Sequence, residues 1–116
     1  MARTKLRQSF SYAIDGLSYA VRSGRNMKIH LLATFLVIIL AYYFGFSRLE
    51  WAILMLTIFM VLAAETMNSA VEKTVDLVTR DYHPIAKIAK NLAAGSVLLT
   101  AINAVIIAIL LFGPHL

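Results

Sequence analysis

Four polar side chains follow an apolar run, and their spacing predicts that they share one face of a helix. The run, residues 51–64, carries no charge and a single hydroxyl group. Glu65, Asn68, Glu72 and Asp76 come directly after it. At about 100° and 1.5 Å per residue, the four project from one stripe about 16 Å long. Three carboxylates and an amide in this arrangement indicate a site for proton transfer or metal binding.

The distance of each carboxylate from the apolar run suggests its chemistry. Glu72 and Asp76 lie one turn apart and could share Mg²⁺, which takes carboxylate and phosphate oxygens and could also hold a nucleotide triphosphate. Glu65 lies next to the apolar run, where an unpaired carboxylate is costly and marks a functional candidate. Because burial favours the protonated form of a carboxyl group, Glu65 could act as a general base toward a lipid hydroxyl.

A simpler interpretation of the stripe is a solvated helix face whose acids are paired by neighbouring cations. Asp76 and Arg80 have the i,i+4 spacing of such a pair, and Lys73 is also close in sequence. Positive charge for phosphate groups is available at Lys87 and Lys90, after the helix break at residues 83–84. These two lysines could equally be interface anchors that extend their charges toward water.

Composition places the helix in a membrane. Apolar residues make up 60% of the 116 residues, and the mean hydropathy is +0.77. A chain of this size cannot bury that much apolar surface in its own core, so we expect one membrane-embedded domain, residues 1–116. The chain lacks cysteine, which excludes disulfides and thiolate chemistry. In such a chain the net charge of +5 indicates membrane topology rather than nucleic-acid binding.

The sequence predicts an all-α integral membrane protein with three transmembrane helices and an amphipathic surface helix. The spans are expected at about residues 29–46, 51–78 and 86–112, with apolar lengths near the roughly 20 residues that a bilayer requires. Residues 4–24 repeat apolar side chains at a period near 3.6, which is typical of a helix lying in the membrane interface.

The distribution of Lys and Arg predicts the orientation. The segment before the first span and the connection between the second and third are rich in these residues, whereas the connection at residues 47–50 holds only Arg48. Because positive segments stay in the cytoplasm, we expect a cytoplasmic N-terminus, residues 73–90 inside and residue 48 outside. This orientation, in a bacterial inner or plasma membrane, would bring the carboxylates to the side where ATP is available.

Several motifs together resemble the prokaryotic diacylglycerol kinase family, and in particular its undecaprenol kinase branch. They are "SFSYAIDG", "RNMKIH", "ETMNSAVEKTVDL", "HPIAKIAK" and "NLAAGSVLL", in this order and with matching spacing over nearly the whole chain. The resemblance implies a homotrimeric membrane kinase whose active sites are shared between neighbouring protomers. It also implies ATP and Mg²⁺ as reactants at the cytoplasmic face and a lipid alcohol, undecaprenol or diacylglycerol, as the acceptor.

The resemblance also implies roles for individual residues. Glu65 matches the general base, Asn68 the amide that orients the site, and Glu72 the ligand of nucleotide-bound Mg²⁺. The remaining matches concern the nucleotide: an acidic contact at Asp76, a phosphate-binding lysine at Lys90, a surface-helix contact at Tyr12, and Asp81 and His83 in the connection that covers it.

Two positions depart from the family pattern, because Gly24 and Asn91 stand where acids are usual. At Asn91 a nucleotide-side hydrogen bond is retained without the charge. An increased Mg²⁺ requirement, relieved by an acid at position 24, is therefore expected. The main hypothesis is a lipid kinase. The alternatives are a catalytically impaired relative that binds lipid or nucleotide, and a different membrane role such as a small transporter subunit.

Overall fold

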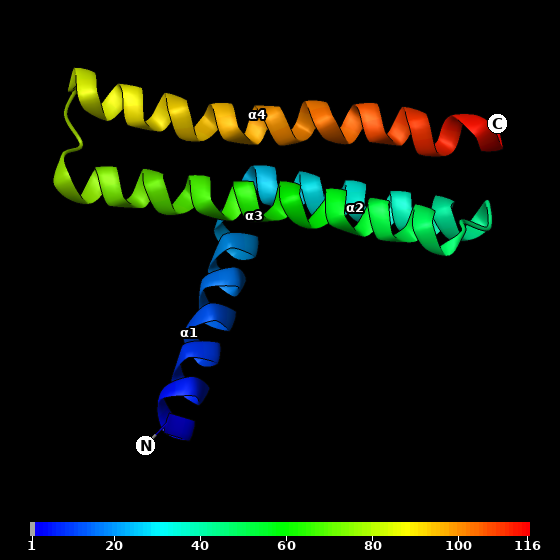
Figure 1. Ribbon diagram of the computed structural model, residues 1–116. Coiled ribbons are helices and arrows are strands. Elements are labelled where there is room, and N and C mark those ends of the chain that lie inside the picture. Colours follow the sequence, from blue (N-terminus) through cyan, green and yellow to red (C-terminus); the bar gives the residue numbers. More distant parts are fainter. Residues whose placement is uncertain (1) are drawn as a thin grey trace.

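The computed structural model describes the backbone of residues 2–116 and the side chains of residues 5–24 and 26–116 (Figure 1). The chain forms four α-helices, α1 (Ala2–Ser23), α2 (Arg25–Tyr43), α3 (Arg48–Val78) and α4 (Pro84–Phe112), followed by the short 3₁₀ helix η1 (Gly113–His115). No strand occurs in this described part. The predicted all-α membrane architecture is confirmed, because α2, α3 and α4 are each long and apolar enough to cross a membrane.

The three long helices lie side by side, and α1 leaves them at a steep angle (Figure 1). α3 packs along α4 on one side and against α2 on the other, while α1 touches α2 and α3. Large apolar side chains cover α1, and many of them are exposed, including Leu6, Phe10 and Ile14. Such a helix can bury these side chains in the membrane interface.

Local sequence signals fix the ends of the helices. Ser47 caps α3 in a reciprocal capping box with Glu50, so α3 begins three residues before the predicted span. His83 caps α4 through its Nδ1 atom, and Pro84 follows at the first helical position. α2 ends at Tyr43, earlier than residue 46, because Gly45 has a φ of +67°, which favours glycine and turns the chain.

One end of the helical bundle holds the packed core, and we call it the closed end. Buried side chains from three helices and the α2–α3 turn meet there: Ala41, Phe46, Leu54, Ile58 and Leu111. The imidazole of His115 stacks on the rings of Phe44 and Phe46 and lies 2.7 Å from Glu50 Oε2. These contacts hold η1 against the start of α3.

The opposite end of the bundle is organised differently. α3 and α4 extend beyond the junction of α1 and α2 and are joined by the connection at residues 79–83 (Figure 1). Here the side chains of α3 face α1, α4 and two polar pockets, and the buried residues on this part of the helix are polar, Glu65 and Asn68. The candidate functional residues therefore lie at the end of the bundle opposite the packed core.

Candidate functional site

Three of the four stripe residues line one polar pocket, which we call the carboxylate pocket. Its volume is about 360 Å³, and it lies where α1 ends, α2 begins and α3 passes beside them. The lining residues are Tyr19, Ser23, Gly24, Asn26, Glu65, Asn68, Ser69, Glu72 and Lys73. The helical spacing correctly predicted that Glu65, Asn68 and Glu72 come together.

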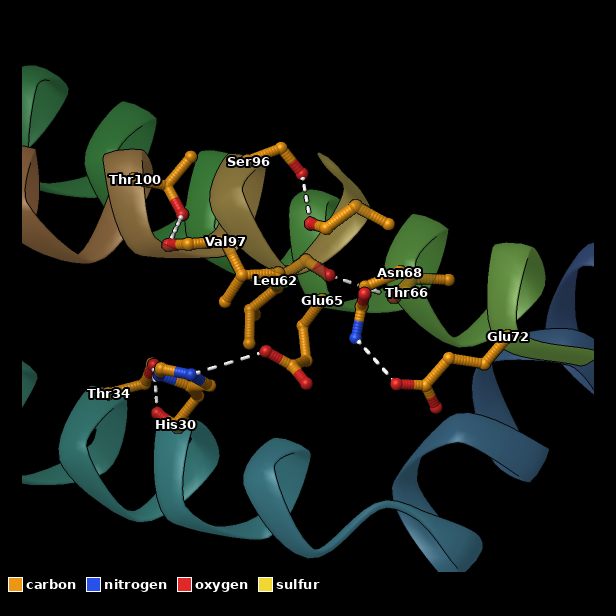
Figure 2. A network of polar contacts seen from close by, with 11 residues as sticks. His30, Thr34, Leu62, Glu65, Thr66, Asn68, Glu72, Ser96, Val97 and Thr100 are labelled. Atoms are coloured by element: carbon orange, nitrogen blue, oxygen red, sulfur yellow. Dashed lines mark hydrogen bonds and ion pairs between the residues drawn. The ribbon is translucent and has the colours of Figure 1, made fainter. Parts of the chain in front are cut away.

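Glu65 and Asn68 are buried polar residues with unsatisfied acceptors. Their exposed fractions are 4% and 8%, and neither Glu65 Oε2 nor Asn68 Oδ1 accepts a hydrogen bond from any described residue. Asn68 uses its Nδ2 atom to donate to Glu72 Oε1 over 3.4 Å (Figure 2). A buried acceptor without a donor costs about 1–3 kcal/mol, so this pair favours a ligand that brings a hydroxyl donor.

Glu65 also faces a residue that sequence reasoning did not select. His30 of α2 places its Nε2 atom 3.4 Å from Glu65 Oε2, as Figure 2 shows, without the alignment of a hydrogen bond. The available signal was an ionisable side chain at the edge of an apolar run, which in a membrane protein marks a functional candidate. The periodicity of α3 alone could not reveal a partner on another helix.

Asp76 turns away from the other stripe residues and pairs with α4. Lys90 Nζ lies 2.7 Å from Asp76 Oδ1, and both side chains are about 40% exposed. The simpler interpretation, an i,i+4 pair of Asp76 with Arg80, is therefore wrong. Asp76 pairs with Lys90 instead because α4 packs along this face of α3 and presents a lysine at the same level. Exposed ion pairs contribute little stability, so the pair's main effect is to fix the position of the Lys90 ammonium relative to α3.

A second polar pocket, the loop pocket, lies next to this ion pair. It has a volume of about 390 Å³ and is lined by Val75, Thr79, Arg80, Asp81, Tyr82, His83, Ala86, Lys87, Lys90 and Asn91. Three cations gather in it, which suits a phosphate-bearing ligand. Four of the predicted nucleotide residues, Asp81, His83, Lys90 and Asn91, are brought together here.

Tyr12 lies outside both pockets. It is on α1, its side chain is 68% exposed, and it lines neither the carboxylate pocket nor the loop pocket. Among the described residues there is also no group of three His, Asp or Glu side chains placed to hold a metal ion. The exposed carboxylate of Glu72 is the pocket's other acid beside the buried Glu65.

Gly24 owes its place to close packing at the elbow between α1 and α2. A Cβ atom on Gly24 would lie 2.8 Å from the backbone oxygen of Ala20 and 3.1 Å from Met27 Cβ. The first distance is shorter than a side-chain carbon tolerates against backbone. An acid at position 24 therefore requires the elbow to move, so the expectation that it would simply restore a missing metal ligand needs correction.

Lys73 connects the surface helix to the pocket. Its ammonium group lies 5.7 Å from the centre of the Tyr19 ring, within the range of a cation–π contact. The contact joins the last turns of α1 to the part of α3 that carries Glu72. The position of α1 is thus coupled to the wall of the carboxylate pocket.

Comparison with known proteins places this geometry in a family. Residues 11–112 match the family model of prokaryotic diacylglycerol kinase. The chain is 39% identical to the undecaprenol kinase of Bacillus subtilis over 109 residues, which cover 94% of this chain and 89% of that protein. It is 45% identical over 109 residues to a diacylglycerol kinase of Synechocystis, covering 93% of this chain and 62% of that protein.

A more distant relative covers the chain even more fully. The diacylglycerol kinase of Escherichia coli is 26% identical over 112 residues, 97% of this chain and 92% of that protein. The family match spans the second half of α1, all three long helices and both polar pockets. The chain therefore belongs to the prokaryotic diacylglycerol kinase family and is a lipid kinase.

Proposed function

We propose that the protein transfers the γ-phosphoryl group of ATP to the hydroxyl of a membrane lipid alcohol, either undecaprenol or diacylglycerol. The observation that carries this proposal is the buried carboxylate of Glu65. One of its oxygens lacks a hydrogen-bond donor, as does Asn68 Oδ1, and both residues line a pocket that also contains Glu72. The two relatives, an undecaprenol kinase and a diacylglycerol kinase, supply the two acceptor classes.

In the proposed reaction, the lipid hydroxyl donates a hydrogen bond to Glu65, and Asn68 orients the same group. Glu65 takes the hydroxyl proton as the alcohol oxygen forms a bond to the γ-phosphorus, and the bond from that phosphorus to the bridging oxygen breaks to release ADP. Phosphoryl transfer requires mainly positioning and compensation of charge. General-base catalysis by a positioned carboxylate contributes about 10²–10⁴-fold.

The residues fit a magnesium ion that arrives with the nucleotide. Mg²⁺ is commonly held by one or two carboxylates together with phosphate oxygens and water. Glu72 is exposed to the carboxylate pocket and would be the protein ligand, with Asn68 bonded to one of its oxygens. When bound, the ion neutralises charge on the phosphate oxygens.

The loop pocket is the proposed nucleotide site. Lys90 would bind phosphate oxygens, supported by Arg80 and Lys87, while Asp76 of α3 holds the Lys90 ammonium by an ion pair. Asp81, His83 and Asn91 would contact the nucleotide from the connection and from α4. Tyr12 would contact it from α1.

We further propose a homotrimer in the bacterial inner membrane with sites shared between protomers. The separation of Tyr12 from both pockets of its own chain supports a role toward a neighbouring chain. A shared site would also bring an additional wall to the half-open carboxylate pocket.

A second candidate function is a family member that binds lipid or nucleotide with little turnover. It is favoured by the two neutral residues that stand where acids are usual in the family. Gly24 lines the carboxylate pocket, and Asn91 lines the loop pocket. Purified protein in detergent, supplied with Mg-ATP and either undecaprenol or diacylglycerol, should form lipid phosphate with one of them. Binding of both reactants without lipid phosphate would support this second function instead.

The proposed orientation makes a separate prediction. Because the chain has no cysteine, single-cysteine variants can be labelled with a membrane-impermeant thiol reagent in intact cells. A cysteine at position 48 should react without permeabilisation, whereas one at position 80 should react only after it. The positive-inside distribution of Lys and Arg is the physical basis. The reverse labelling pattern would invert the assigned topology.

A further inference from the structure

We propose that His30 is a positioning residue that accepts the proton from Glu65 and passes it to solvent. The inference rests on the proposed function, in which Glu65 receives a proton from the lipid hydroxyl. It assigns a role to a residue on a different helix, α2, whose Nε2 atom is 3.4 Å from Glu65 Oε2 (Figure 2).

The exposure of the two side chains gives the direction of the relay. The Glu65 side chain is 5% exposed, so a proton that it has taken has little direct contact with water. The His30 side chain is 24% exposed and lies near the start of α2, so it is the member of the pair that can be reached from outside the protein. Among the described side chains, His30 is the one basic group within 4 Å of a Glu65 oxygen.

The surroundings of His30 supply few competing groups. On its inner side the residue borders an apolar cavity of about 110 Å³, to which α4 contributes only Ala104, Ile107 and Ala108. The other titratable side chains that line the carboxylate pocket are Tyr19 from α1 and Glu72 and Lys73 from α3. Glu72 accepts a hydrogen bond from Asn68, and Lys73 lies over the Tyr19 ring, so each of them already has a partner other than His30.

The proton balance of each cycle is complete. The lipid oxygen loses its proton to Glu65, the acid then transfers that proton to the neutral Nε2 of His30, and the imidazolium releases it to water. Glu65 returns to the carboxylate form needed for the next lipid molecule. Histidine suits this task because its charge changes in the neutral pH range. A small approach of α2 would align the 3.4 Å contact for the transfer.

The test compares His30→Gln with the native chain in pH profiles of kcat for lipid phosphate formation. Gln retains size and polarity but cannot carry the proton. We expect kcat to fall by about 10-fold or more near neutral pH, with KM for lipid and Mg-ATP unchanged. The pH profile of kcat should differ in shape between the native chain and the variant, because glutamine cannot carry the proton.

Two further variants separate a relay from a structural role. Free imidazole should partly restore His30→Ala, because a small base can occupy the space beside Glu65. Thr34→Val is the matched control one turn away. It removes a hydroxyl whose one hydrogen bond within the described residues goes to the His30 backbone oxygen, and it should keep native kcat.

The outcomes are distinguishable. A fall of kcat by the same factor at every pH, without imidazole rescue, or an unchanged kcat in His30→Gln, would overturn the relay while leaving Glu65 as the base. If the native chain forms lipid phosphate from neither alcohol, the proposed function is overturned, and the relay with it.

Discussion

Glu65→Gln is expected to lower kcat for lipid phosphate formation by about 10²-fold or more, the range for removal of a general base. The substitution keeps the shape of the side chain and its place beside Asn68 but removes its basicity. Binding of Mg-ATP should remain, because the loop pocket does not include residue 65. Initial rates at saturating lipid and nucleotide measure the effect.

Glu50→Gln is the matched control for this substitution. It makes the same chemical change on the same helix, but at the closed end, where Glu50 contacts Ser47 and His115. Turnover in this variant should remain close to native. Native turnover in Glu65→Gln, with the variant still folded by circular dichroism, would exclude Glu65 as the base.

Glu72→Gln is expected to raise the free Mg²⁺ concentration required for half-maximal activity by about 10–100-fold, the scale on which even outer-shell changes alter metal affinity. Glu72 is the exposed carboxylate of its pocket, and glutamine cannot supply the negative charge that a hard cation prefers. The measurement is lipid phosphate formation against free Mg²⁺ at fixed ATP.

The KM for lipid alcohol provides the internal control for Glu72→Gln, and it should change little because Glu65 and Asn68 are retained. An unaltered Mg²⁺ dependence would show that Glu72 is not a metal ligand. Loss of lipid binding instead would indicate that the carboxylate mainly supports Asn68, which donates a hydrogen bond to it through Nδ2.

Hydropathy and helical spacing predict much of this molecule. The three long helices are predicted from the lengths of the apolar segments. The shared position of Glu65, Asn68 and Glu72 on one face is predicted from the 3.6-residue period of a single helix. These features depend on local chemistry, which a sequence displays directly.

Features that depend on two helices could not be predicted in the same way. Asp76 pairs with Lys90 rather than Arg80 because α4 lies along α3 at a particular register. His30 meets Glu65 for the same kind of reason, through the register of α2. Gly24 shows a third case: its lack of a side chain suggested a missing ligand, whereas the distance to the Ala20 oxygen shows that a side chain there requires the backbone to shift.

α2 is held by the packed core at the closed end, and a rotation about that point moves its other end. Ala41 is fully buried there, and His30 lies eleven residues away, about 17 Å along the helix axis at 1.5 Å per residue. A rotation of α2 by about 5° around that fixed point would displace His30 by roughly 1.5 Å at this helical rise. Movement of this size is enough to bring the imidazole into or out of bonding distance of Glu65, so in the proposed relay the packing at the closed end would set the precision of proton transfer at the opposite end of the bundle.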